Sequence, residues 1–196
     1  MTQVDLSFDP AYWLEVDLEA EPATWVPAAV RERWQAGGLP PQPDLLDAVV
    51  HAVTMVVTTI REEDPPPFMA FLLHPAPDDG PLAAVALRTE GLEEPIDLDQ
   101  LAAEMRLPEE MLTLPAEERV LDSVAGPVVR MVQRFASPDS PGVETVTETI
   151  AYAWMLDDDG HPVVLTLSTA FEDLDDAVRW RNALDELALS VTVTGG

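Results

Sequence analysis

The stretch TVTETIAYAWMLDDDGHPVVLTLST, residues 145–169, decides the fold class. Its first part, 145–156, is long and rich in β-branched and aromatic residues, as expected of a strand with one covered face. Asp158-Asp159-Gly160 then predicts a tight turn, and 163–169 predicts a second strand. Two strands joined by so short a turn are antiparallel neighbours. The stretch therefore predicts an antiparallel sheet rather than a parallel nucleotide-binding fold.

The pattern continues on both sides of this hairpin. Strands are predicted at 119–124 and 128–136, around Ala125-Gly126-Pro127, and a Ser/Pro/Gly loop at 137–142. An amphipathic helix at 173–189 ends the pattern. Nearer the amino terminus, alternating residues predict strands at 12–18, 68–74 and 82–89. We expect a single α+β domain over 1–196, with an antiparallel sheet of about six to seven strands flanked by helices and a closing carboxy-terminal helix.

Three further helices are predicted. The first begins at Pro22 and ends before Gly37-Gly38. The second runs from Asp44 to Glu63, although the Val- and Thr-rich part 53–60 is also compatible with a strand. The third is capped by Asp97, with Gln100 three residues later, and ends at Pro108. Residues 109–118 fit no regular element.

Composition excludes several chemistries. The chain has no lysine and no cysteine. Schiff-base catalysis, a P-loop lysine, thiolate nucleophiles, disulfides and Cys-ligated metals are therefore absent from its repertoire. Its 37 acidic residues face only ten arginines, and the formal net charge is −27. Nucleic acid and anionic membranes are unsuitable partners for such a surface, whereas a basic protein segment or a cation is favoured.

The same acidity has plainer explanations. Acidic surfaces keep proteins soluble, and an Ala-, Pro- and Arg-rich chain without Lys is typical of a GC-rich genome; salt adaptation also enriches Asp and Glu. The first residues, 2–9, lack the basic and apolar regions of a secretion signal. The apolar stretch 48–57 is too short to span a bilayer. We expect a soluble, cytoplasmic protein.

No catalytic or metal-binding motif is complete. His51 lies one helical turn after Asp47, which suits a general base, but no nucleophile accompanies the pair. His74 and His161 each precede a proline, and no two histidines have metal-ligand spacing. The acidic run 157–160 lacks the alternating acids of a calcium loop. We therefore nominate no catalytic residue, metal or cofactor.

Arg130 and Arg134 are the most distinctive basic residues. Alternation places them on one face of the strand 128–136, where Glu144 or Glu148, across the next hairpin, can pair with them. Tyr152 and Trp154 share a face of that next strand. On a concave, open side of the sheet, these four residues would bind an anionic or peptide partner. On a covered side, they would form cross-strand salt bridges and core aromatics.

The carboxy-terminal half carries a resemblance. Residues 125–130, the strand ending at 151–154, and the strand 164–169 followed by the helix 174–189 resemble the Mog1/PsbP-like sandwich of uncharacterised actinobacterial proteins. The resemblance covers about 119–193 and supplies no catalytic residues. It implies an antiparallel sheet flanked by helices, with mostly accessory or binding roles, including chaperones of secreted effectors. The two helices before Phe68 depart from the simplest form of that fold.

The sequence thus leads to one preferred hypothesis and two alternatives. The preferred hypothesis is a non-enzymatic binding or accessory protein, similar to a chaperone or adaptor, that holds a partner polypeptide with an acidic face. A hydrolytic enzyme that uses Asp and His groups is the first alternative. The second is a structural component that associates only with copies of itself.

Overall fold

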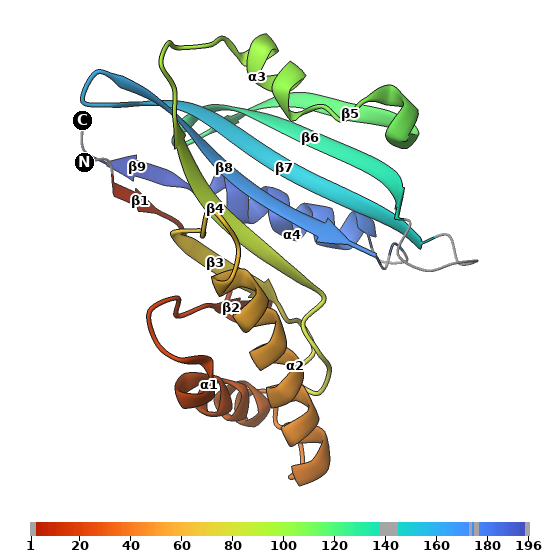
Figure 1. Cartoon of the computed structure of the whole chain (residues 1–196). Helices are drawn as coiled ribbons and strands as arrows, with labels where there is room; N and C mark the ends of the chain where they lie inside the picture. The colour runs from red at the N-terminus through yellow and green to blue at the C-terminus, as the bar shows by residue number, and fades with distance from the viewer. Residues whose placement is uncertain (1–2, 138–144, 173, 175–176, 195–196) are drawn as a thin grey trace. The chain divides into compact units, whose positions relative to one another are not determined.

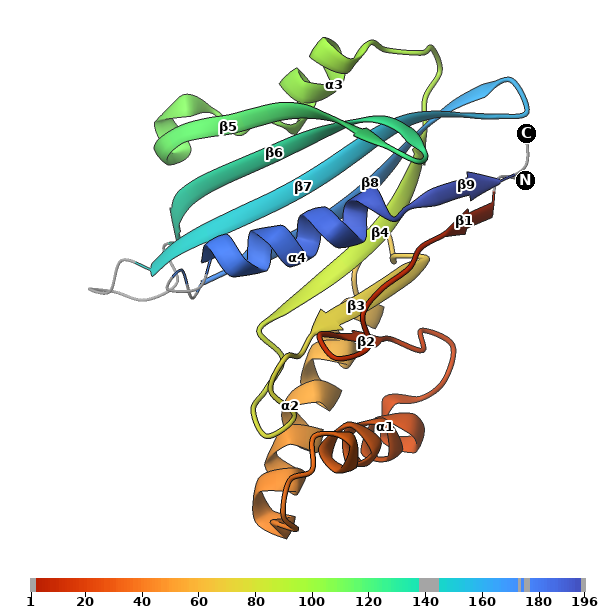
Figure 2. The ribbon, with the colours of Figure 1, turned by 180° about the vertical axis from the view of Figure 1, so that it is seen from behind.

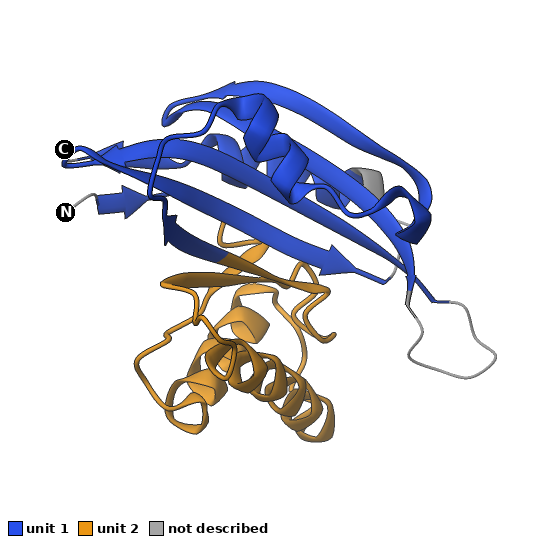
Figure 3. Cartoon of the chain, turned by 45° about the horizontal axis from the view of Figure 1, so that its top comes forward, with its two compact units in different colours: residues 1–8, 87–196 blue, residues 9–86 orange. Residues whose placement is uncertain are grey.

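The computed structural model describes residues 3–137, 145–172, 174 and 177–194. It divides into two compact units, coloured separately in Figure 3. Unit 1 comprises 1–8 and 87–196, and unit 2 comprises 9–86. The strand β4, Ala83–Gly91, contributes residues to both units. A single domain over the whole chain stays a prediction.

The strands form two antiparallel sheets. The larger has seven strands in the order β2-β3-β4-β8-β7-β6-β5, and the smaller pairs β1 with β9. The predicted α+β class with an antiparallel sheet is confirmed. The strands are β1 (Gln3–Asp5), β2 (Trp13–Glu15), β3 (Met69–Leu73), β4 (Ala83–Gly91), β5 (Leu112–Ser123), β6 (Gly126–Ser137), β7 (Thr145–Asp158), β8 (His161–Phe171) and β9 (Thr192–Thr194).

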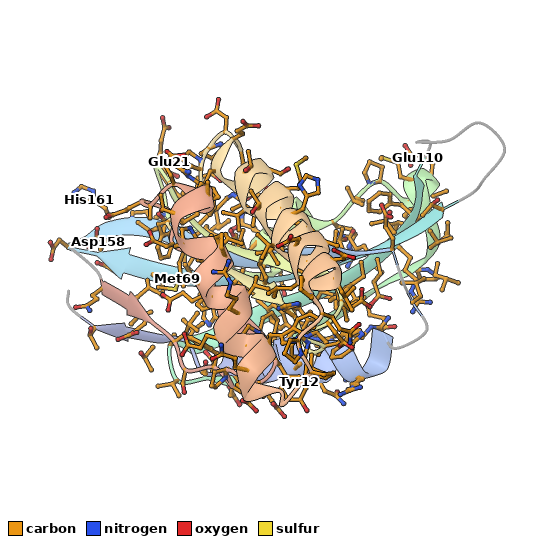
Figure 4. The ribbon with its side chains drawn as sticks, turned by 90° about the horizontal axis from the view of Figure 1, so that it is seen from below. Tyr12, Glu21, Met69, Glu110, Asp158 and His161 are labelled. Atoms are coloured by element: carbon orange, nitrogen blue, oxygen red, sulfur yellow. The ribbon has the colours of Figure 1, made fainter. Side chains whose placement is uncertain are left out.

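In unit 1, β5 to β8 follow one another as antiparallel neighbours, as the sequence predicts. The predicted tight turn joins β7 to β8, with Asp158 paired to His161; Figure 4 labels both residues. The β5–β6 turn lies at residues 124–125, one residue earlier than predicted, because Gly126 already pairs with Ser123. The predicted loop 137–142 lies outside the described residues except for Ser137, which ends β6.

Helices cover both faces of the sheet within unit 1. Figures 1 and 2 show α3 (Leu98–Met105) on one face and α4 (Ala177–Leu189) on the other. The predicted capping box at α3 is present, because the Asp97 carboxylate accepts from the Gln100 amide at 2.8 Å and the Gln100 side chain accepts from the Asp97 amide at 2.9 Å. The predicted closing helix is α4, which begins at Ala177 and is followed by β9. Of the predicted helix start, 173 and 175–176 lie outside the described residues.

The α3 face of the sheet has its own apolar core. Leu101 and Ala102 of α3 pack on Val129 and Met131 of β6 and on Ala153 of β7. Successive side chains of a strand point to opposite faces, so Arg130, which lies between Val129 and Met131, points to the α4 face. The strand β6 thus separates an apolar α3 face from an α4 face that carries charge.

In unit 2, α1 (Pro22–Ala36) and α2 (Pro43–Arg61) pack together over an apolar core. Val53 and Val57 are fully buried in that core, and residues 53–60 are helical. The strand alternative for 53–60 is therefore wrong, because burial of one helical stripe outweighs the modest helix penalty of β-branched residues. The predicted strand 12–18 is shorter, because the Asp17 side chain accepts hydrogen bonds from the amides of Glu19 and Ala20 and turns the chain.

Arg33 fixes a loop of unit 2. Its guanidinium donates hydrogen bonds to four backbone carbonyls, those of Pro10, Ala11, Trp13 and His74, at 2.5, 3.1, 3.0 and 2.5 Å. Figure 4 labels Tyr12, which lies within this loop. The His74 side chain is buried, and its Nε2 lies 2.8 Å from the carbonyl oxygen of Asp79. Burial, aided by the charge of Arg33, lowers the pKa of His74 and keeps the imidazole neutral near pH 7.

The helix α2 is long and apolar enough to span a membrane, judged by length and composition alone. It extends well beyond the apolar stretch 48–57. A mostly buried core helix of a soluble protein passes the same test, but only 22% of the apolar window of α2 is buried, along a stripe that includes Val49 and Ile60. The absence of a membrane partner stays a prediction.

Candidate functional site

The structure brings Arg130, Arg134, Tyr152 and Trp154 to one face of the sheet, as alternation predicts. Arg130 pairs in register with Tyr152, and Val128 with Trp154. This face is the one that α4 covers. Tyr152 and Trp154 are fully buried and Arg130 is nearly so. The Arg134 side chain keeps 29% exposure.

Arg130 is neutralised by a carboxylate from α4. Its Nε donates to Asp185 Oδ1 at 2.6 Å, and the Tyr152 hydroxyl donates to the same oxygen at 2.5 Å. Burial opposes the charge of Arg130, but the hydrogen bond and charge of Asp185 outweigh it and raise the pKa of the guanidinium. Burial and the Asp185 contact also raise the pKa of Tyr152, so its hydroxyl stays protonated. The three side chains form a closed contact between sheet and helix.

Glu148 forms a second centre on the same face. This fully buried carboxylate accepts from Arg134 Nε at 2.6 Å and from Arg181 Nε at 2.7 Å, and Arg181 Nη2 also contacts it. Burial alone would raise the pKa of Glu148, but the hydrogen bonds and charges of Arg181 and Arg134 outweigh it and hold the pKa below its ordinary value. Arg181 also lies 3.7 Å from Glu117 of β5. Two arginines thus balance one buried acid.

The aromatic residues complete this face. The Tyr152 and Trp154 rings are stacked with centroids 6.4 Å apart. Trp154 Nε1 donates to Ser123 Oγ at 2.9 Å, and Ser123 Oγ donates to the carbonyl oxygen of Gly126 at 2.6 Å. The indole is therefore tied to the turn between β5 and β6. We call Arg130, Arg134, Glu148, Tyr152, Asp185 and Arg181 the buried polar network.

Sequence reasoning identified part of this network. Of its two candidate partners for the arginines, Glu148 is used, and Glu144 lies outside the described residues. It missed Asp185 and Arg181, which approach the sheet from a distant helix. Their signal was present, because they stand four residues apart and so share a face of α4. The network joins α4 to the sheet, as the salt-bridge interpretation expects.

The other candidate residues are dispersed. His51 and Asp47 are both exposed on α2 in unit 2, and His161 lies in the β7–β8 hairpin of unit 1. Within the described part of the chain, no group of three or more His, Asp and Glu residues could hold a metal ion. These positions assemble no catalytic constellation.

An exposed surface lies along η1 (Glu109–Met111) and β5. It carries acidic residues and large apolar ones: Met111, Leu114, Val120 and Val124 are each more than half exposed, and alternation places Leu114 and Glu117 on the opposite side of β5 from Val120. The acidic members are Glu109, Glu110, Glu117, Glu118 and Asp122, all exposed. Figure 4 labels Glu110. We call residues 109–124 the β5 surface.

A shallow open depression adjoins the β5 surface. Its volume is about 520 Å³, and it is lined by Asp99, Ala103, Arg106, Leu107, Pro108, Glu109 and Glu118. Three acids thus surround one arginine, and Arg106 is paired with Glu118. This depression was not predicted, because no regular element was assigned to 109–118, which contributes Glu109 and Glu118 to its lining.

Comparison with known proteins gives a likeness of fold. No family model matches the chain, and no curated protein matches its sequence. A crystal structure of LpqN, described as involved in cell envelope biogenesis of Mycobacterium tuberculosis, matches with a TM-score of 0.54 and 11% sequence identity. The match covers 100% of this chain and 85% of that one. At this identity the chain is similar to LpqN in fold alone.

Proposed function

We propose that this chain is a non-enzymatic binding or accessory protein of the cytoplasm that holds a partner polypeptide on an acidic surface. The β5 surface is the observation that carries this proposal. It combines exposed apolar side chains with five exposed acids, in a chain of net charge −27. Apolar contacts provide affinity for a polypeptide, and acids select basic segments of it. We also propose that the chain is related to the Mog1/PsbP-like proteins, which its carboxy-terminal half resembles.

The distribution of the rare cations supports the same conclusion. Arg130, Arg134 and Arg181 are bound to carboxylates of the buried polar network. In the part of the chain that the structure describes, Glu109, Glu110 and Asp122 form no ion pair. Their charge is therefore available to a partner. The same charge disfavours nucleic acid and anionic membranes.

Matched charge variants test the proposal. The E109Q/E110Q/D122N variant removes from the β5 surface the three charges that are unpaired in the described part of the chain, and the E90Q/E93Q/E94Q variant removes three from exposed positions elsewhere in unit 1. Each chain is immobilised and exposed at low salt to extract from the cells that express it, and bound polypeptides are eluted with high salt and identified.

We expect the wild type and the second variant to retain the same polypeptides and the first variant to lose them. Equal retention by all three chains would show that the polypeptides bind through the overall negative charge of the protein and not through the β5 surface, and would overturn the proposal. Retention of nothing by the wild type would also overturn it.

A further inference from the structure

The outer edge of β5 is open within the described part of the chain. β5 is the last strand of the seven-stranded sheet and pairs only with β6 there. Figures 1 and 2 show it as the outermost strand. Its first half is irregular, with register shifts between Leu112 and Glu117. From Glu117 to Ser123 the pairing with β6 is continuous, so this half presents a regular edge.

A proline fixes which backbone groups of β5 point outward. Asp122 faces Pro127, which has no N–H and cannot take part in a doubly hydrogen-bonded pair. Because the two pair types alternate, Leu121 and Arg119 are hydrogen-bonded to β6. The N–H and C=O groups of Glu118, Val120 and Asp122 therefore point away from the sheet. They form a ready template for another strand.

The side chains of these three residues share one face. Val120 stands opposite Val129, and Glu118 stands opposite Met131, both in the α3 core. The edge therefore presents an acid, an apolar residue and an acid on the α3 side, and Val120 is 54% exposed. Glu118 also lines the depression, together with Asp99 and Glu109.

A second copy of the chain is a poor occupant of this edge. If two copies of β5 paired antiparallel about Val120, Glu118 of each would face Asp122 of the other. Like charges directly opposite one another in a sheet are destabilising. Two chains of net charge −27 also repel each other at a distance. The complementary strand carries cations where β5 carries acids.

We infer that the outer edge of β5 accepts an extended segment of another polypeptide as an added antiparallel strand, with a basic residue two positions before and two positions after an apolar one. The apolar residue lies beside Val120, and the basic residues lie beside Glu118 and Asp122. Glu118 already pairs with Arg106, so the basic residue beside Glu118 shares that carboxylate, whereas the one beside Asp122 meets an acid with no ion pair in the described part of the chain. Backbone hydrogen bonds hold the segment, and its side chains give the selectivity. This inference rests on the proposed function and adds the mode of binding.

The test uses the full chain and a defined probe, the peptide Thr-Lys-Thr-Val-Thr-Lys-Thr, blocked at both ends. Its binding is measured by fluorescence anisotropy at low salt. In an antiparallel pair centred on Val120, the amides of Val and Lys in the peptide point toward β5, and those of the flanking Thr residues point away. We expect N-methylation of the central Val to abolish binding and N-methylation of the neighbouring Thr to preserve it. Replacement of both Lys by Glu is expected to abolish binding.

Two variants of the chain provide the matching test. V120P removes the outward N–H without removing a bond to β6, a substitution that edge strands tolerate. We expect it to weaken binding at least about tenfold, a loss of roughly 1.4 kcal/mol, and V120T, which keeps the N–H, to bind within about twofold of the wild type. Circular dichroism confirms that both variants are folded.

The outcomes separate the two proposals. If the peptide binds but its affinity is the same for both N-methylated forms, strand addition is wrong, and an acidic binding surface still stands. If the unmodified peptide does not bind, this inference is overturned, and the matched charge variants decide the proposed function independently. The N-methylated peptides need no change to the chain, so they decide the question even if V120P does not fold.

Discussion

The two sides of the β5–β6 hairpin use charge in opposite ways. On the α4 side, Arg130 and Glu148 are buried and every charge of the network meets an opposite one. Along β5, Asp122 is exposed and forms no ion pair in the described part of the chain, and Glu118 pairs only with the exposed Arg106; both lie beside the exposed Val120. A buried charge must be paired to be tolerated, whereas an exposed acid costs little by itself. Of the ten arginines in the chain, three are paired with acids on the α4 side, and most of the 37 acidic residues therefore have no arginine to pair with.

Removal of the buried carboxylate is expected to give the largest effect. E148Q leaves Arg134 and Arg181 without their shared counter-charge, and we expect it to lower the free energy of unfolding by about 3 kcal/mol. Urea unfolding followed by circular dichroism measures this, with the exposed E90Q as control. A loss below about 1 kcal/mol would show that the network is no more sensitive than a surface pair.

The pH dependence of the same variant follows from the depressed pKa of Glu148. A carboxylate with a lowered folded-state pKa stabilises the fold above its unfolded pKa and loses this contribution as pH falls through the folded pKa. The difference in unfolding free energy between wild type and E148Q should be largest near neutral pH. It should shrink as the pH falls below 4.5, the ordinary pKa of a glutamate. Urea unfolding of both chains at several pH values measures it. A difference that grows toward acid pH would contradict the assignment.

Two variants at the Arg130 centre distinguish the contribution of the Asp185 charge to stability from that of a hydrogen bond to the same carboxylate. D185N removes the counter-charge of a buried guanidinium, and we expect a loss of about 2 kcal/mol. Y152F removes one hydrogen bond to the same carboxylate and is expected to cost about 1 kcal/mol. Equal losses of unfolding free energy from the two variants would show that the charge of Asp185 contributes no more to stability than its hydrogen bond with Tyr152.

Changes at the β5 edge are expected to have the smallest effect on stability. E118Q/D122N should alter the free energy of unfolding by no more than about 1 kcal/mol, because both residues are exposed and only the Glu118–Arg106 pair is lost. The variant also removes the like charges that oppose edge-to-edge pairing, so we expect concentration-dependent self-association. Sedimentation at several concentrations measures this. Equally strong self-association of the wild type would instead favour the self-associating structural component.

Much of the sheet was predictable because its signals are local. The half-apolar composition and the tight turn of 145–169 predicted β7 and β8. The alternation of side chains along a strand predicted that Arg130 and Arg134 share one face, beside Glu148. β5 was predicted only from 119 onward. Its first half carries Pro115 and two register shifts, which break the alternation by which a strand is recognised.

The interaction of Asp185 with Arg130 and the open edge of β5 were not predictable from a local pattern. Asp185 lies 55 residues from Arg130, and it reaches the guanidinium only because α4 packs on that face of the sheet. The open edge depends on the order of strands, which no single strand encodes.

The sequence by itself determined the charge imbalance, the absence of lysine and cysteine chemistry, and the face on which each strand residue lies, because these depend on composition and on a period of two residues. Only the tertiary structure decided which arginines are buried with which acids and which strand is left at the edge. Those outcomes depend on long-range packing, in which burial forces some charges to pair and leaves Glu118, Val120 and Asp122 exposed at the edge of the sheet.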